Sequence, residues 1–146
     1  MRADRKLVVD TNFWVSRLLM PDGAAARAVD HGLSLGIPLV SEETLTELSD
    51  VLSRDKFDRY VSRTDRQQFL RLIGGIVRVI PITRRVHVCR DPKDDKFLDV
   101  ALNGQAGVIL TGGHDLLELH PFHGIEIISP ADFLMRATSL SPPSTA

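Results

Sequence analysis

Four acidic side chains stand at positions along the chain from which they could meet in one site. They are Asp10, Glu47, Asp94 and Asp115, and each follows a short apolar segment typical of a buried strand. Carboxylate oxygens, without a cysteine ligand or a paired histidine, suit Mg²⁺ or Mn²⁺. Such ions activate water and stabilise the attacking and leaving oxygens of a phosphodiester. The residue types therefore point to metal-assisted hydrolysis.

The elements that must position these acids alternate between strand and helix patterns. We expect strands at 6–9, 38–40, 77–82, 108–110 and 125–128. We expect a first helix that Thr11 or Asn12 caps and that ends at 21–23, further helices at 24–35, 41–52, 62–76 and 94–105, and a short helix from Pro130. Strict alternation favours an α/β fold with a mostly parallel sheet covered by helices on both faces. Sites in open parallel sheets lie at the carboxyl ends of the strands, which is where the acids fall.

Helical spacing refines the orientation of two of these acids. Apolar residues lie three, four and seven positions after Asp94, so Asp94 should stand on the packed face of its helix and Asp95 should be more exposed. Glu47 is four positions before Val51 and borders the buried face of its own helix. A carboxylate facing inward needs a partner, and a divalent cation would supply one.

A simpler interpretation exists for each acid taken alone. An aspartate at a strand-to-helix turn commonly caps the helix, and Asp94 could do no more than that. Only the joint occurrence of several acids at one sheet edge favours a metal site. The basic stretch at 54–66 is interpreted as a solvated face, whereas Arg90 and Lys93 lie closer to the acids and are candidates to meet a phosphate.

Composition limits the classes of protein that remain. The chain has 146 residues, enough for one domain, which we place at 1–138, followed by a Ser/Pro-rich tail at 139–146 expected to be disordered. The net charge of −1 argues against a classical DNA-binding module. A single cysteine, Cys89, excludes an intramolecular disulfide. Without a signal peptide or an apolar run of about 20 residues, we expect a cytoplasmic protein without membrane contact.

Several motifs, in order, resemble those of PIN domains. They occupy 8–12 around Asp10, 46–48 with Glu47, 91–98 with Asp94, 110–117 with Asp115, and a closing segment at 128–134. The resemblance covers nearly the whole chain, from about residue 7 to residue 134. It is strongest to the VapC-like, PIN_3-type bacterial branch described as toxin components of toxin–antitoxin systems.

The resemblance implies both a fold and an activity. The fold would be a three-layer α/β/α sandwich, and the activity would be cleavage of single-stranded RNA with Mg²⁺ or Mn²⁺. It also implies a homodimer and a small antitoxin partner. By position, the catalytic acids would be Asp10, Glu47 and Asp94, which also bind the metal together with Asp115. Supporting roles fall to a further group, consisting of Asn12, Asp91, Asp95 and Thr111.

One position departs from the family pattern. An aspartate usually follows the Thr-Gly of the fourth motif, and here that place is Gly113. Asp115 stands two residues further on, and we expect it to support the site from behind the direct ligands. The departure keeps open an alternative, a catalytically weakened PIN-fold module that binds RNA or an antitoxin. A phosphatase or a DNA nuclease using the same carboxylates is a third hypothesis.

Overall fold

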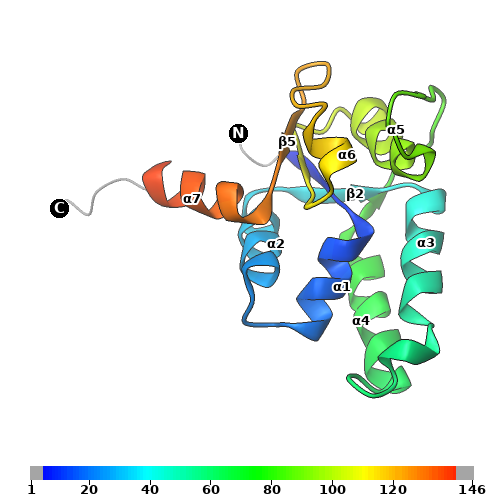
Figure 1. Ribbon diagram of the computed structural model, residues 1–146. Helices are drawn as coiled ribbons and strands as arrows, with labels where there is room; N and C mark the ends of the chain where they lie inside the picture. The colour runs from blue at the N-terminus through cyan, green and yellow to red at the C-terminus, as the bar shows by residue number, and fades with distance from the viewer. Residues whose placement is uncertain (1–4, 141–146) are drawn as a thin grey trace.

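A computed structural model of the protein describes residues 5–140, and within them five parallel strands form one sheet (Figure 1). The strand order is β3-β2-β1-β4-β5, so the first strand in the sequence is the central strand of the sheet. The strands are β1 (Lys6–Val9), β2 (Ile37–Val40), β3 (Arg78–Val79), β4 (Val108–Leu110) and β5 (Glu126–Ile128). All four pairings are parallel, and therefore the carboxyl ends of all strands lie at one edge of the sheet.

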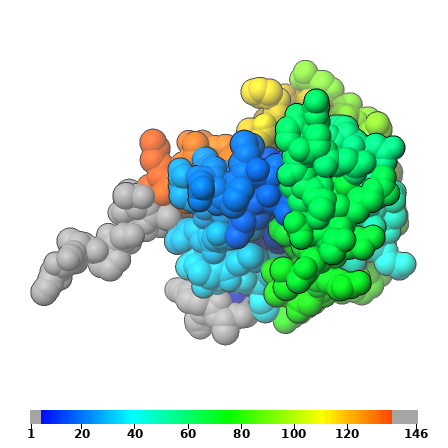
Figure 2. Space-filling model, turned by 90° about the horizontal axis from the view of Figure 1, so that it is seen from below, coloured from blue at the N-terminus to red at the C-terminus, as the bar shows by residue number. Residues whose placement is uncertain are grey.

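Helices cover both faces of this sheet, which confirms the expected α/β/α sandwich. In Figure 1, α5 and α6 lie above the strands, and α1, α2 and α4 lie below them. Figure 2 shows the lower face, where α4 (green) lies beside α1 and α2 (blue). The helices are α1 (Thr11–Leu19), α2 (Ala24–Leu35), α3 (Glu42–Leu52), α4 (Arg63–Ile76), α5 (Asp95–Gly104), α6 (His114–Leu117) and α7 (Pro130–Leu140), with 3₁₀ turns η2 (Asp55–Phe57) and η3 (Pro92–Asp94).

The alternation of side chains along β1 builds two cores. Leu7 and Val9 point into the layer of α1–α4 and α7, whereas Val8 points into the layer of α5 and α6. Both cores consist of aliphatic and aromatic residues that are almost fully buried. A strand buried on both faces explains why 6–9 is continuously apolar after Lys6.

Two expectations, one on the third strand and one on the basic stretch, need correction. The strand expected at 77–82 is limited to Arg78–Val79, since the last backbone bond of this segment to β2 is the one that the Ile80 amide donates to the Val40 carbonyl at 2.7 Å. The basic stretch at 54–66 is not wholly solvated. Arg66 is 2% exposed, because its guanidinium donates to the Leu52 carbonyl at 2.9 Å and pairs with Asp58.

The expected cap of α1 also needs correction. We expected Thr11 or Asn12 to cap that helix, but Asp10 does so, and its Oδ1 accepts from the Phe13 amide at 2.9 Å. At the other end of the chain, α7 runs to Leu140 and includes the first two residues of the expected tail, whereas 141–146 lie outside the described residues. Among the helices described, none is long and apolar enough to cross a membrane.

Candidate metal centre

Three acidic side chains from two separate segments meet at the carboxyl edge of the sheet. Asp94 ends η3, Asp91 caps that same turn, and Asp115 lies in α6 just beyond β4. Each of the three offers a carboxylate oxygen, and these oxygens all lie within 4.8 Å of one another. The sequence predicted a role at the metal site for each of these residues, and the structure brings all three together.

Asp10 lies next to this group and is buried, at 8% exposure. The Thr111 hydroxyl donates to its Oδ2 at 2.5 Å, and the Phe13 amide donates to its Oδ1 at 2.9 Å. Burial raises the pKa of Asp10, and the charges of Asp94 and Glu47 raise it further, so the two hydrogen bonds offset only part of the shift. Asp10 is thus a carboxylate that two hydrogen bonds fix beside other acids.

Asp94 carries the same electrostatic imbalance. Partial burial raises its pKa, and the carboxylates of Asp91 and Asp115 raise it further, while the Lys96 ammonium lowers it. Like charges held this close repel at neutral pH, and a divalent cation among them would remove the repulsion. The donor set consists of carboxylate oxygens alone, which fits Mg²⁺ or Mn²⁺.

Glu47 has a different partner, one that the sequence analysis missed. The Lys96 ammonium lies 2.9 Å from Glu47 Oε2, and the Thr11 hydroxyl donates to Glu47 Oε1. The Lys96 side chain is only 10% exposed and also donates to the Lys93 carbonyl. A usable signal existed in the sequence, because Lys96 stands one helical turn before the buried Val100.

Asp95 is buried at 7% exposure, so the expectation that it would be more exposed than Asp94 is wrong. Its Oδ1 accepts from the Cys89 amide at 2.9 Å and from the Val88 amide at 3.1 Å. Burial would raise the pKa of Asp95, but these hydrogen bonds outweigh it and the pKa is lowered. Asp95 therefore holds backbone rather than facing the acidic group.

Asp95 is the first of three polar side chains spaced by four residues along α5. Asp99 Oδ1 accepts from the Val86 amide at 2.8 Å, and Asn103 Oδ1 accepts from the Thr83 and Arg84 amides at 3.0 Å. We call this set, Asp95, Asp99 and Asn103, the α5 polar stripe. It fixes the extended segment 83–89, which leads directly into Asp91 and Asp94. The stripe thereby positions the acidic group.

The remaining predicted residues are one buried threonine and three exposed polar or basic side chains. Thr111 is fully buried and contacts Asp10, as expected of a support. Asn12 and Lys93 are exposed. Arg90 is exposed as well and pairs with Glu118 at 3.3 Å. The structure thus brings together all of the predicted acids except Asp95, with two basic side chains near them in sequence.

Comparison with known proteins identifies the family. The PIN-domain family model matches residues 6–115, about three quarters of the chain. The chain belongs to the PIN-domain family. A relative of this PIN domain, the uncharacterized protein MJ1680 of Methanocaldococcus jannaschii, is 30% identical over 116 residues, covering 78% of this chain and 74% of the relative.

Two solved structures share the fold of this PIN domain. VapBC2 from Rickettsia felis, solved bound to a DNA fragment from its promoter, matches with a TM-score of 0.59 at 11% identity, covering 85% of this chain and 98% of that one. PAE2754 from Pyrobaculum aerophilum matches with a TM-score of 0.60 at 16% identity, covering 92% and 90%. Members of the PIN-domain family are, as a rule, metal-dependent nucleases.

Gly113, where the family usually has an aspartate, is the N-cap residue of α6 in this PIN domain. It is exposed, and a Cβ built on it would lie 3.5 Å from the Thr111 hydroxyl, an ordinary contact. The position would therefore accept an aspartate without strain. Asp91 and Asp115 are the acids that stand beside Asp94 in its absence.

Proposed function

We propose that this PIN domain is a metal-dependent endoribonuclease that hydrolyses phosphodiester bonds of single-stranded RNA. The observation that carries the proposal is the meeting of Asp91, Asp94 and Asp115 within 4.8 Å, next to the buried carboxylate of Asp10. A carboxylate group of this kind, in a nuclease family, is best explained by a bound cation that takes part in hydrolysis.

In this proposal some of the acids bind the cation, and the others are held in place beside it by neighbouring side chains. Asp94, Asp115 and Asp91 would bind Mg²⁺ or Mn²⁺, with Asp10 fixed beside them by Thr111. The ion would supply Lewis acidity and lower the pKa of a water molecule. Glu47 completes the catalytic acids, and Lys96 determines where its carboxylate points by holding one of its two oxygens.

RNA would be bound at the rim by cations close to the acids. Arg90 and Lys93 flank Asp91 in sequence and are exposed, so their charges can reach a phosphate. Asn12, exposed in the first turn of α1, would orient the substrate from the other side. Since the net charge of the chain is −1, affinity should come from these local cations rather than from the global field.

The proposal includes the cellular setting. We propose that the protein is the toxin of a toxin–antitoxin pair, acts in the cytoplasm, forms a homodimer and is neutralised by a small antitoxin. The fold likeness to VapBC2, a toxin–antitoxin complex, supports this setting. Induced expression with and without Asp94→Asn tests it, since a toxin should arrest growth only in the unsubstituted form.

The activity itself is tested by incubating the protein with single-stranded RNA, single-stranded DNA and a phosphate monoester, each with Mn²⁺ or with EDTA. We expect cleavage of RNA alone, in Mn²⁺ alone. Asp94→Asn should abolish cleavage. Asp132 is an exposed aspartate on α7, and the control variant Asp132→Asn should leave cleavage unchanged. Cleavage of DNA or of the monoester would favour a DNA nuclease or a phosphatase instead, and full activity of Asp94→Asn would overturn the proposed site.

Gly113 favours a second candidate function, a PIN-fold module that binds RNA or an antitoxin without cutting RNA. The missing family aspartate removes one negative charge from the acidic group. This candidate predicts saturable binding of single-stranded RNA or of an antitoxin, and intact RNA after long incubation with Mn²⁺. Mn²⁺ calorimetry separates the two further, because a weakened module need not bind the ion.

A further inference from the structure

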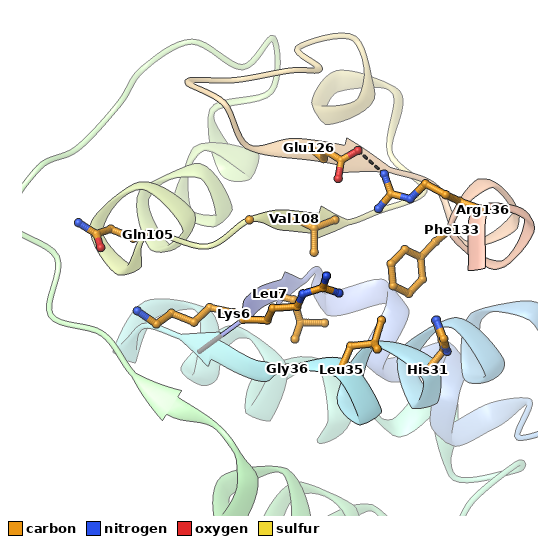
Figure 3. A pocket seen from close by; sticks show the side chains of 13 residues that line it. Lys6, Leu7, His31, Leu35, Gly36, Gln105, Val108, Glu126, Phe133 and Arg136 are labelled. Atoms are coloured by element: carbon orange, nitrogen blue, oxygen red, sulfur yellow. Dashed lines mark hydrogen bonds and ion pairs between the residues drawn. The ribbon is translucent and has the colours of Figure 1, made fainter. Parts of the chain in front are cut away.

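A cavity of about 610 Å³ opens at the edge of the sheet opposite the metal centre. It lies at the amino ends of β1, β4 and β5, between the end of α2 and the start of α7 (Figure 3). We call it the basal cavity, and its principal lining residues are Lys6, Leu7, Leu35, Val108, Phe133 and Arg136. The volume is in the range that small-molecule sites occupy.

One wall of the basal cavity is apolar. In Figure 3 the Phe133 ring and the Leu35 side chain point toward one another, and Leu7 and Val108 lie beside them. These four side chains come from α7, α2, β1 and β4, so four elements of the fold converge on the site. His31 lies against the Phe133 ring at 5.4 Å between centroids and extends the apolar surface.

The charges around the basal cavity are mainly positive. Glu126 is the one carboxylate among its lining residues, and it is paired with Arg136 (Figure 3). Two further cations, Arg5 and Lys6, also line the cavity, and within residues 5–140 neither side chain has a hydrogen-bond or ion-pair partner. Among the described residues, the cavity thus combines an apolar wall with two cations that have no partner.

We propose that the basal cavity binds a small amphipathic anion, a molecule with an apolar body and a single carboxylate, sulfonate or phosphate. The body lies against Phe133 and Leu35, and the anionic group lies near Arg5, because the Lys6 side chain extends away from Phe133 in Figure 3. This site is distinct from the metal centre, because the two lie at opposite ends of β1.

Gly107 provides a way to close the cavity without disturbing the fold. It lines the cavity, and a Cβ built on it meets no atom within 4 Å. Its backbone does not lie in the left-handed region, so any L-residue except proline fits, proline being excluded because the amide donates to the Lys6 carbonyl. Gly107→Phe therefore adds a bulky ring at the lining of the cavity. Gly74→Phe, on an equally open and exposed position of α4, is the matched control.

The experiment measures the fluorescence of anilinonaphthalene sulfonate titrated with the full chain, followed by competition with octanoate and octylamine. We expect saturable binding of one dye per chain that octanoate displaces and octylamine does not. Gly107→Phe should abolish this binding and Gly74→Phe should leave it intact. Arg5→Gln should weaken it roughly two- to fivefold, as loss of one exposed charge pair would.

Two results would overturn the proposal. Unchanged dye binding in Gly107→Phe would place the dye elsewhere, and equal displacement by octylamine would remove the selectivity for an anion. Mn²⁺ binding and RNA cleavage by Gly107→Phe are measured in parallel and should match those of the unsubstituted chain. Failure of the basal site and failure of the metal centre are therefore distinguishable.

Discussion

The Thr111 hydroxyl donates a hydrogen bond of 2.5 Å to Oδ2 of Asp10, across 101 positions of the sequence. The same hydroxyl oxygen accepts from the Gly113 amide at 3.0 Å. One buried side chain at the end of β4 therefore fixes both the carboxylate at the end of β1 and the loop that leads to Asp115. The contact joins the two neighbouring central strands at the edge where the acids meet.

Removal of that hydroxyl should destabilise the protein. Thr111→Val keeps the volume but leaves a buried Asp10 oxygen without its donor, so we expect the free energy of unfolding to fall by about 1–3 kcal/mol. Urea denaturation monitored by tryptophan fluorescence measures this. Thr111→Ser retains the hydroxyl, so its free energy of unfolding should fall less. Equal losses in the two variants would mean that the hydrogen bond contributes nothing.

Restoration of the family aspartate should strengthen the metal centre. Gly113→Asp adds a carboxylate near Asp94 at a position that accepts a Cβ without a clash. We expect the Kd for Mn²⁺ to fall on the order of tenfold, as an added anionic ligand would cause. Calorimetry measures it, with Gly112→Asp on the adjacent open position as the control. An equal gain in both variants would indicate a general charge effect.

Lys96 should oppose metal binding while it stabilises the metal-free protein. Lys96→Met breaks the buried ion pair with Glu47, and we expect a loss of about 1–3 kcal/mol in unfolding free energy, reduced because Glu47 is 30% exposed. The same change removes a positive charge beside the acids, so affinity for Mn²⁺ should rise. A fall in Mn²⁺ affinity would show instead that Lys96 is needed to hold Glu47 in a binding position.

The acids make stability depend on pH and on metal together. Burial raises the pKa of Asp10 and of Asp94 above 3.8, so the stability these groups contribute is complete below that pH and is lost as pH rises through the folded pKa. At about pH 7, saturating Mn²⁺ at about 100 times Kd should add roughly 2.7 kcal/mol to the free energy of unfolding. At lower pH the ion must displace protons from these carboxyls, so the rise in Tm should be smaller.

A variant separates this electrostatic effect from general acid sensitivity. Asp94→Asn removes one of the repelling charges, so we expect a higher Tm than the unsubstituted chain at about pH 7 without metal. It should also gain less from Mn²⁺. A lower Tm without metal would mean that the Asp94 carboxylate stabilises the fold, contrary to its raised pKa.

The α5 polar stripe should control access to segment 83–89. Asn103 binds the backbone of Thr83 and Arg84 through both ends of its amide, donating to the Arg84 carbonyl at 2.8 Å. Asn103→Ala should release this segment and speed trypsin cleavage after Arg84 and Arg85, measured by mass spectrometry. The other asparagine of the chain, Asn12, provides the control in Asn12→Ala, and equal cleavage rates would show that Asn103 does not restrain the segment.

Local pattern was sufficient for most of the fold. The runs at 6–9 and 108–110 were predicted with the bounds that the structure has, since continuous apolar residues there are required by a strand buried on both faces. The alternation of strands and helices predicted the parallel sheet. A parallel sheet in turn predicted that the acids meet at the carboxyl ends of its strands. β3 was overestimated, because its apolar residues continue past the point where the strand leaves β2.

The sequence could not predict the contacts between side chains of α5 and the irregular backbone segment that lies across this helix. Helical spacing indicates which residues of α5 face an apolar core, but not that an extended segment lies across another face of the helix and needs acceptors. Asp95 is buried for that reason. Lys96 was missed because its partner, Glu47, comes from a helix 49 residues earlier, and spacing within α5 carries no information about it.

The central position of β1 affects the order in which the protein can be completed during translation. Asp10 is among the first residues synthesised, but the hydroxyl that fixes it arrives with Thr111, and the acidic group lacks a member until Asp115 has been added. A ribosome-bound chain shorter than this has no assembled metal centre. The proposed nuclease activity would therefore be absent from a nascent chain until Asp115 has been synthesised.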